Sequence, residues 1–561
     1  MQPGDGRYAD EVVERSSLPS KVNRDPDAGE PRWVSQAIWA FIVLGVSLRV
    51  IRYALNFPLW SDEAFVAANF LDRDYLGLLR PLDYGQICPV LFLWVERALV
   101  GLLGFSEATL RLFPLVCGVA CVFLFRRVAA SVTHGLPLLL AVGVFAVSVS
   151  PVRNSSQVKP YSSDLLAALL LLTTALSWLN DRERTGRLWV LVALAPLTLM
   201  LSHPAVFVAG GVSLGLASSV WRTGRRQALV PFLAFNLATA ACFGVLYVLI
   251  MRPQAAEMAE WRLGYWGGGF PPLKNPVALA RWLVAAHTGK MLAYPFGGNN
   301  GGSTPSFLLA VAGAAVLWRQ RHRATLVMLL TPFGLTLVAA AFQKYPYGVD
   351  SRQMQYVAPA MCLLVGLGAA SLCRSIPVPG YRLLTTWLLT LGLVVSAALS
   401  LAHDFSHPFS AHYDVKSRGF ARSFWPELAR DAEVACLFRD FGVYERRWFN
   451  MYSAYYLCNQ AIYSPPLRRG LGTGGPRWEA VSESRPLRCV LFNGTPVEHP
   501  QVIAWLAAMK TRYELRRTDR RVLDMADPGG PRLDETIVIF EFVPGPGAEI
   551  ARSAPGGTVR R

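Results

Sequence analysis

Apolar runs close to membrane-spanning length recur along the chain between residues 33 and 402. A transmembrane helix needs about 20 such residues to cross roughly 30 Å of hydrocarbon. The pattern predicts spans at 33–54, 108–126, 136–152, 165–179, 188–202, 205–221, 228–250, 306–318, 324–342, 356–373 and 383–402. We therefore expect an all-α polytopic membrane domain over 33–402, with about eleven transmembrane helices.

Arginines gather in alternate loops between these runs. They follow the second, fourth, sixth, eighth and tenth spans: Arg126, Arg127, Arg182, Arg184, Arg187, Arg222, Arg225, Arg226, Arg319, Arg321, Arg323, Arg374 and Arg382. The positive-inside rule makes this face cytoplasmic and places the tail at 1–32 on the same side. We expect a multi-pass protein of the cell (inner or plasma) membrane. The opposite, extracytoplasmic face then carries the loops at 55–107, 153–164, 251–305 and 343–355.

The first outer loop is expected to hold two juxtamembrane helices that lie along the interface. The stretch 87–104 contains Glu96 and Arg97, which argue against a lipid-embedded span. Counting it as a span would also move the arginines of the next loop to the outer face. A second interfacial helix is predicted at 62–80, where apolar and polar positions are mixed.

The composition changes after residue 403, where charged residues and prolines replace the apolar runs. Short β-rich runs and a helical pattern predict a small α/β extracytoplasmic domain over 403–543. The runs are 433–438, 489–492 and 536–543, and the helical pattern covers 500–515. The Gly/Pro-rich tail at 544–561 is expected to be disordered. Outside the membrane, two of three cysteines can form a disulfide, and the sequence does not select the pair: Cys436, Cys458 and Cys489.

Composition supports a membrane protein and argues against a nucleic-acid-binding one. Of the 561 residues, 53% are hydrophobic and 17% are charged, whereas soluble proteins carry about 25% charged residues. The formal net charge of +17 raises the alternative of nucleic-acid binding. However, the basic residues form small clusters between apolar runs instead of one patch. We therefore expect membrane lipid, and no nucleic acid, as a partner.

Two adjacent carboxylates, Asp62 and Glu63, follow the first predicted span. Helix capping explains them well, because Ser61 is a good N-cap and acidic side chains favour the first turn. Catalysis is the alternative reading. A carboxylate at the membrane boundary can act as a general base toward an acceptor hydroxyl.

Further ionisable and polar residues stand at the outer ends of other spans. Each has an ordinary explanation: snorkelling of cations to the headgroups, a helix-start acid, a structural histidine, or an ion pair with Asp350. The predicted topology nevertheless brings them all to one face, where ionisable residues at membrane depth usually mark a site. They are Arg153, Lys159, Asp164, His203 and Arg352.

Carboxylates and cations at one interface suit the transfer of a sugar from a lipid phosphate. The carboxylate takes the acceptor's proton as its oxygen attacks the anomeric carbon, and the cations stabilise the departing phosphate. A transporter or flippase is an alternative, but it should show ionisable residues in mid-span and repeat symmetry. An outer-face polysaccharide ligase or polymerase, with a diphosphate-linked donor, also stays open.

Three motifs, at 53–65, 88–94 and 106–114, resemble GT-C integral membrane glycosyltransferases. The closest group is that of dolichyl-phosphate-mannose protein mannosyltransferases and aminoarabinose-transferase-like proteins, and the resemblance covers about 33–400. The stretches at 159–164 and 202–204 match the layout of the same group. The resemblance implies two juxtamembrane helices, a polyprenyl-phosphate-sugar donor and inversion at the anomeric carbon. It also implies Asp62 as the catalytic carboxylate, with Glu63 beside it and Asp164 as a second acid.

The chain departs from this group at one position. Aminoarabinose transferases have a lysine before the proline of the second juxtamembrane helix, where this chain reads Gln86-Ile87-Cys88-Pro89. We therefore expect the donor phosphate to be bound from elsewhere, by Lys159 or Arg352 first. Arg153, His203 and Tyr161 are further candidates. The sugar and the acceptor (lipid, glycan or protein) stay open. No cofactor is certain, and a divalent cation stays an option.

Overall fold

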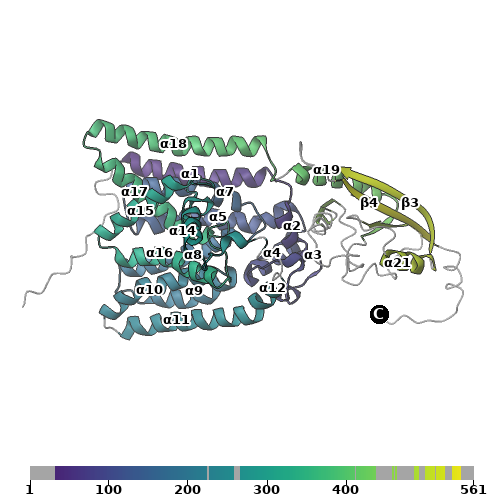
Figure 1. Ribbon diagram of the computed structural model, residues 1–561, viewed down its shortest axis with the longest axis horizontal. Helices are drawn as coiled ribbons and strands as arrows, with labels where there is room; N and C mark the ends of the chain where they lie inside the picture. The colour runs from purple at the N-terminus through teal and green to yellow at the C-terminus, as the bar shows by residue number, and fades with distance from the viewer. Residues whose placement is uncertain are drawn as a thin grey trace, which may run out of the picture.

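The computed structural model describes residues 32–223, 226–257, 264, 266–410, 412–436, 458–459, 461–463, 486–491, 500–511, 513–524 and 534–544. The tails expected at 1–32 and 544–561 lie, apart from Arg32 and Pro544, outside these residues. The chain forms a bundle of long helices with a smaller α/β domain beyond one end (Figure 1). The predicted fold class is confirmed.

Eight helices in the described part of the chain are long and apolar enough to cross a membrane. They are α1 (Arg32–Ala54), α5 (Glu107–Ala130), α8 (Tyr161–Asn180), α10 (Ala205–Thr223), α11 (Arg226–Leu246), α16 (Arg323–Ala341), α17 (Ala358–Ser375) and α18 (Pro379–Ser406). Three shorter apolar helices are α6 (Leu136–Val147), α9 (Gly186–Leu201) and α15 (Thr304–Arg319). Each predicted span thus falls on an apolar helix, whereas the number that cross the membrane stays a prediction.

Small residues let the inner helices pack closely. A side chain at Gly366 of α17 would collide with Ala141 of α6, and one at Gly368 would collide with Leu309 of α15. Because lipid gives helices no hydrophobic drive to associate, such close packing is what holds a membrane bundle together. In contrast, α18 runs along the outside of the bundle beside α1 (Figure 1). Most of its apolar side chains are exposed.

Shorter elements connect the long helices. They are α2 (Ser61–Ala67), α3 (Asn69–Asp72), η1 (Gly77–Leu79), η2 (Asp83–Gly85), α4 (Val90–Leu103), α7 (Val149–Asn154), η3 (Tyr247–Met251), α12 (Arg252–Glu257), η4 (Gly267–Gly269), α14 (Pro276–Thr288), η5 (Lys290–Leu292) and η6 (Gln355–Val357). The end of the bundle that carries α2 and α4 is called the site end. The arginine-rich turns α10–α11 and α17–α18 lie at the opposite end (Figure 1). Which end faces the cytoplasm stays a prediction.

The first juxtamembrane helix is shorter than predicted. Instead of one helix over 62–80, the chain forms α2, α3 and η1 in succession. Arg73, extended at the end of α3, explains the break. Its guanidinium donates to the carbonyl oxygens of Gly77 at 3.3 Å and Pro81 at 2.8 Å, and it pairs with Asp83 at 2.8 Å. These bonds fold the segment into a compact turn. The second helix, α4, begins directly after Pro89.

The C-terminal domain consists of α19 (His412–Leu428), β1 (Glu433–Cys436), β2 (Leu487–Leu491), α21 (Pro500–Lys510), β3 (Tyr513–Asp524) and β4 (Asp534–Pro544). The strands form one sheet in the order β1-β2-β4-β3, with β1 and β2 parallel and the other pairs antiparallel. The buried strand expected near 536–543 is β4, which lies between two neighbours. Strand β3 was not expected, because its many arginines hide the pattern of an edge strand. Helix α21 accordingly ends before the predicted 515.

The C-terminal domain contacts the bundle next to α2. Arg418 of α19 donates to the carbonyl oxygen of Asn56 at 2.8 Å and pairs with Glu107 at 2.9 Å. Cys458 and Cys489 are buried free thiols, so they are not bonded to each other. The Cys458 thiol instead lies 3.6 Å from the carbonyl oxygen of Ala64 in α2. The side chain of Cys436 lies outside the described residues.

Candidate active site

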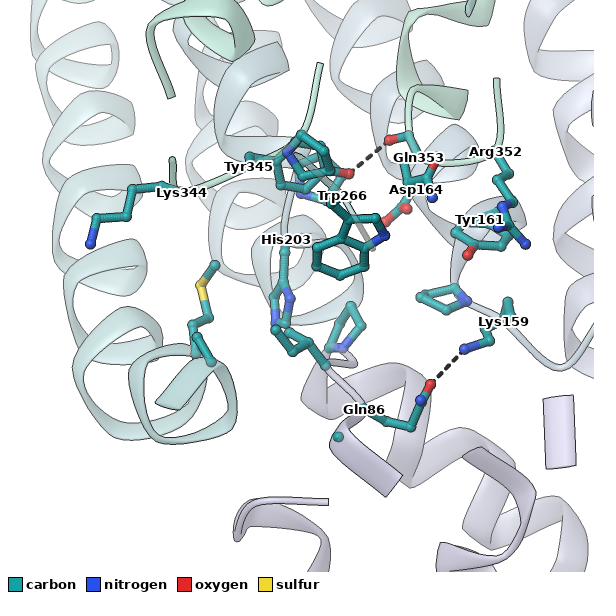
Figure 2. A pocket seen from close by; sticks show the side chains of 18 of the residues that line it. Gln86, Lys159, Tyr161, Asp164, His203, Trp266, Lys344, Tyr345, Arg352 and Gln353 are labelled. Atoms are coloured by element: carbon teal, nitrogen blue, oxygen red, sulfur yellow. Dashed lines mark hydrogen bonds between the residues drawn. The ribbon is translucent and has the colours of Figure 1, made fainter. Parts of the chain in front are cut away.

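A large cavity opens at the site end of the bundle. Its volume is about 1030 Å³. Its walls come from α2, η2, the loop before α8, the turn between α9 and α10, the α11–α12 region and the loop after α16. Figure 2 shows its polar side chains converging from these separate elements. We call it the site cavity.

Six of the eight residues predicted for the site line this cavity. They are Asp62, Lys159, Tyr161, Asp164, His203 and Arg352. The chain brings them together from positions up to 290 residues apart. Glu63 and Arg153 do not line it. The roles of all eight stay predictions at this point.

Asp62 stands between two cations. One carboxylate oxygen lies 3.1 Å from the Lys159 ammonium, and the other lies 3.5 Å from the Arg352 guanidinium. The Asp62 side chain keeps 24% of its surface exposed. The carboxylate is therefore neutralised by its neighbours and still accessible from the cavity.

Glu63 does not face the site cavity and is packed into protein. Its carboxylate pairs with Arg111 of α5 at 2.6 Å and accepts a hydrogen bond from the backbone N–H of Val158 at 2.9 Å. Arg111 also donates to the carbonyl oxygens of Phe57 and Pro58. This pair joins α2, α5 and the loop that carries Lys159. Sequence reasoning did not find Arg111 as the partner, because it stands alone within an apolar run.

Lys159 reaches the position where the sequence departs from aminoarabinose transferases. Its ammonium donates to the side-chain oxygen of Gln86 at 2.6 Å (Figure 2). With 7% of its side chain exposed, Lys159 is nearly buried between Gln86 and Asp62. A lysine from the loop before α8 thus stands beside Gln86 in space. Nothing in the local sequence around Gln86 signals this contact.

Arg352 is held in place by two neighbours. Its guanidinium stacks on the Trp60 ring, 5.3 Å from the ring centre. The carboxylate of Asp350 accepts the backbone N–H of Arg352 at 3.1 Å and lies 3.9 Å from Nε. The expected pairing with Asp350 is therefore present, and Arg352 reaches Asp62 as well. A guanidinium fixed in this way is preorganised to bind an anion.

Asp164 and His203 form the inner wall of the cavity, at the ends of α8 and α9. Asp164 is buried and accepts a hydrogen bond from Ser202. His203 follows in the turn between α9 and α10. Burial lowers the pKa of His203 to about 4, so its imidazole is neutral at physiological pH. His203 can therefore serve as a hydrogen-bonding group but not as a cation.

One side of the cavity is apolar. It is formed by side chains of the α11–α12 region and α16: Phe243, Tyr247, Met251, Ala255, Ala256, Ala339 and Phe342. Lys344 stands at this side, and Tyr345 donates to the carbonyl oxygen of Gln353 at 2.7 Å (Figure 2). The cavity thus joins a charged region to a hydrocarbon-like one, as a site for an amphiphile requires.

The C-terminal domain also contributes to the site cavity. Tyr413 of α19 is among the lining residues, and the contacts of Arg418 with Asn56 and Glu107 fix α19 beside the segment that leads into α2. This contribution lies outside the region that the sequence resemblance covers, so it was not expected.

The described residues hold no group of three or more His, Cys, Asp or Glu side chains that can bind a metal ion. Of the acids that line the site cavity, Asp62 pairs with Lys159 and Arg352, and Asp164 accepts a hydrogen bond from Ser202. The option of a divalent cation stays a prediction.

No family model and no curated protein matches this chain. Solved structures do resemble it. ArnT from Cupriavidus metallidurans bound to undecaprenyl phosphate gives a TM-score of 0.49 at 12% identity, covering 90% of this chain and 97% of ArnT. The Archaeoglobus fulgidus oligosaccharyltransferase in complex with Zn and sulfate gives 0.45 at 11% identity, covering 89% and 72%.

A third structure is the Archaeoglobus fulgidus oligosaccharyltransferase AglB with an inhibitory peptide and a dolichol-phosphate. Its TM-score is 0.41 at 12% identity, covering 90% of this chain and 74% of AglB. ArnT and AglB are both GT-C glycosyltransferases, the group that the sequence resemblance names. At these TM-scores the likeness assigns neither a reaction nor a residue to this chain, and the function has to be inferred from its own side chains.

Proposed function

We propose that this protein is an inverting glycosyltransferase that moves a sugar from a polyprenyl-phosphate donor to an acceptor hydroxyl at the extracytoplasmic face. One observation carries the proposal: Asp62 lies 3.1 Å from Lys159 and 3.5 Å from Arg352 in a cavity that is polar on one side and apolar on the other. A carboxylate and two cations are the groups that this reaction needs.

The donor fits the two sides of the cavity. Its phosphate oxygens accept hydrogen bonds from Lys159 and from the fork of Arg352, and such charge-assisted bonds to phosphate are strong. Its isoprenoid tail lies along the apolar side near Phe243 and Phe342 and continues into the bilayer. This arrangement explains why the charged residues stand at the ends of membrane helices.

The reaction is a single displacement. The acceptor oxygen forms a bond to the anomeric carbon while the bond from that carbon to the phosphate oxygen breaks. Asp62 takes the hydroxyl proton, and polyprenyl phosphate leaves with the electron pair. Lys159 and Arg352 stabilise the charge on the departing phosphate. One displacement at the anomeric carbon inverts its configuration.

Binding of the donor prepares Asp62 for this step. A phosphate between Lys159 and Arg352 competes with the carboxylate for both cations, because all the contacts use the same N–H groups. Asp62 then has free lone pairs to accept the acceptor's proton. The base thus becomes available only when the donor is bound.

The remaining predicted residues take other roles. Glu63 acts as a positioning residue, since its pair with Arg111 holds α2 and the Lys159 loop together. Asp164 and the neutral His203 orient hydroxyl groups of the sugar or the acceptor from the inner wall. Arg153, which does not line the site cavity, has no role in binding the donor phosphate.

The test measures sugar transfer by the purified full-length protein. Synthetic polyprenyl-phosphate hexose and pentose donors are supplied with a membrane extract as the source of acceptor. Free polyprenyl phosphate and glycosylated product are quantified by mass spectrometry. Lys159→Met and Arg352→Gln should each weaken apparent donor affinity about ten- to a hundredfold, because a hydrogen bond to a charged group contributes about 1.5–3 kcal/mol. Lys274→Met, at an exposed lysine outside the cavity, should change nothing.

Two results would reject the proposal. Transport of the lipid across liposomes without release of polyprenyl phosphate would identify a flippase. Release from diphosphate-linked oligosaccharides alone would identify a ligase or polymerase.

A further inference from the structure

A second cavity opens at the flank of the bundle. Its volume is about 530 Å³, which is within the range of small-ligand pockets. It lies between the end of α1, α7 and α18, with Phe296 at its edge. It shares no lining residue with the site cavity. We call it the lateral cavity.

One end of the lateral cavity is cationic. Arg52 and Asp404 form an ion pair there, and their charges cancel. The Arg153 side chain is exposed to the cavity and, within the described part of the chain, makes no hydrogen bond and no ion pair. His403 stands beside them. This end therefore presents one uncompensated positive charge, that of Arg153.

The rest of the cavity is apolar. Its walls are the side chains of Val149, Val152, Phe296, Val395 and Leu399, with small residues of α18 between them. The lining runs along α18 from Asp404 to Gly392. At about 1.5 Å per helical residue this stretch is about 18 Å long, close to the roughly 15 Å of one leaflet of hydrocarbon.

The cavity is open toward the surroundings of the bundle. Helix α18 lies on the outside, beside α1 (Figure 1), and exposes Val395 and Leu399. A Cβ atom added at Gly392 would meet no atom within 4 Å. An acyl chain can therefore enter between α18 and the bundle from the membrane.

We propose that the lateral cavity is a binding site for a phospholipid with an anionic headgroup. The phosphate accepts hydrogen bonds from the Arg153 guanidinium, and one acyl chain lies along α18 down to Gly392. A basic pocket between transmembrane helices with an apolar groove below it has the chemistry of an anionic-lipid site. Inorganic phosphate would leave the apolar wall unused.

The bound lipid connects α18 to the centre of the molecule through α7. Ser150 and Asn154 of α7 hydrogen-bond to Gln355 of η6 at 2.8 Å and 3.0 Å. Arg153 lies between these two residues in the chain. A headgroup on Arg153 therefore holds α7 and α18 together at a position where few side chains of α18 are buried.

The test uses full-length protein in detergent and a photo-crosslinking phosphatidylglycerol, with phosphatidylcholine of the same chains as the zwitterionic comparison. Crosslinked peptides are mapped by mass spectrometry, and affinity is measured by competition with unlabelled lipid. The wild type should be labelled between 392 and 404 and should prefer phosphatidylglycerol. Arg153→Ala should weaken phosphatidylglycerol binding about fivefold, the loss expected for one cation at a lipid surface, and Arg153→Lys should restore most of it.

A second variant separates the chain-binding groove from the charge. Gly392→Leu fills the groove and should reduce crosslinking by both lipids, whereas Gly380→Leu, on the same helix in equally open space, should not. Arg80→Ala controls for loss of an exposed arginine elsewhere at the site end. Unchanged labelling of 392–404 in Arg153→Ala and Gly392→Leu would overturn the proposal. Full competition by glycerol phosphate without acyl chains would also overturn it, in favour of a simple anion site.

Discussion

Asp62 and Glu63 are neighbours in the chain but belong to two different regions of the molecule. Asp62 faces the site cavity with 24% of its side chain exposed, and it lies between two cations that can also bind a ligand. In contrast, Glu63 is 2% exposed and pairs with an arginine that is equally buried. Since successive helical residues point about 100° apart, one acidic dipeptide serves both a cavity and a core. The difference teaches that the exposure of the acid to a cavity, and not its position in the chain, separates a candidate catalytic group from a structural one.

The strongest way to break this comparison is to remove the charge of Asp62. Asp62→Asn keeps the shape of the side chain but cannot take a proton. We expect the turnover number to fall by about 10²–10⁴-fold, the usual contribution of a general base. Because Asp62 is partly exposed, the thermal midpoint should stay close to that of the wild type. Initial rates of polyprenyl phosphate release and a melting curve give both values. An active Asp62→Asn enzyme would remove Asp62 from catalysis.

The matched substitution at the buried acid, Glu63→Gln, should mainly lower stability and not the turnover number of the folded protein. Glu63→Gln leaves the Arg111 guanidinium buried without its carboxylate, and breaking a buried pair in this way costs about 3–5 kcal/mol. We expect a large loss of thermal stability and of folded yield, with lost activity following from unfolding. Melting curves of the folded fraction test this. If Glu63→Gln melts like the wild type but does not transfer sugar, Glu63 acts in chemistry and the proposed division between the two acids fails.

The sequence alone could predict that both acids lie at the end of the first span, but not which of the two faces a cavity and which is buried. Apolar runs predicted the helices, and alternate arginines predicted which span ends share a face. Eight residues were predicted for one site on this basis and from the family resemblance, and six of them line the site cavity. Partners were not predictable in the same way. Arg111 stands within an apolar run, and only the packing of α5 against α2 shows that it neutralises Glu63. Local pattern carries no information about such contacts between distant segments.

Arg153 is a residue that the sequence predicted for the site but that the structure places elsewhere. The sequence suggested one continuous outer loop over 153–164, in which Arg153 and Lys159 would share a ligand. The structure instead places Arg153 on a separate short helix, α7, and turns it to the lateral cavity. A helical turn of six residues flanked by serines has little periodicity to reveal it.

Glu96 sharpens the comparison, because it is buried like Glu63 but has no basic partner in the described part of the chain. Neither of its oxygens has a hydrogen-bond partner among the described residues, and burial raises its pKa well above the ordinary value of 4.5. The folded protein therefore holds this proton more tightly than the unfolded chain does. Stability contributed by the protonated acid is complete below pH 4.5 and is lost as pH rises toward the folded pKa.

Glu96→Gln should remove this dependence. The variant should gain stability over the wild type by up to about 1.4 kcal/mol for each pH unit across that window. Melting curves measured from pH 5 to 8 give the slope, with the exposed Asp431→Asn as the matched control. A difference between Glu96→Gln and the wild type that does not change with pH would mean that an ionised Glu96 is accommodated.

His203 gives the smallest expected effect, and it tests whether the inner wall of the cavity carries charge. With its pKa lowered to about 4 by burial, His203 is neutral throughout the range in which transfer is measured. His203→Gln keeps a neutral hydrogen-bonding group, so we expect the rate to fall by less than about tenfold, the value of a neutral hydrogen bond. The pH–rate profile between 5 and 8 should keep its shape.

The pH dependence of stability that His203 contributes has the opposite sign to that of Glu96. Because the folded pKa lies below the ordinary 6.5, protonation favours the unfolded chain, and the wild type loses stability as pH falls from 6.5 toward 4. His203→Gln should lose less over the same interval, as melting curves at pH 4.5 and 7 will show. An inflection near pH 6.5 in the wild-type rate profile that disappears in His203→Gln would mean that the imidazole is charged during transfer. In that case the donor phosphate would have a third cation, and the cation-rich region would extend from Lys159 and Arg352 to the inner wall.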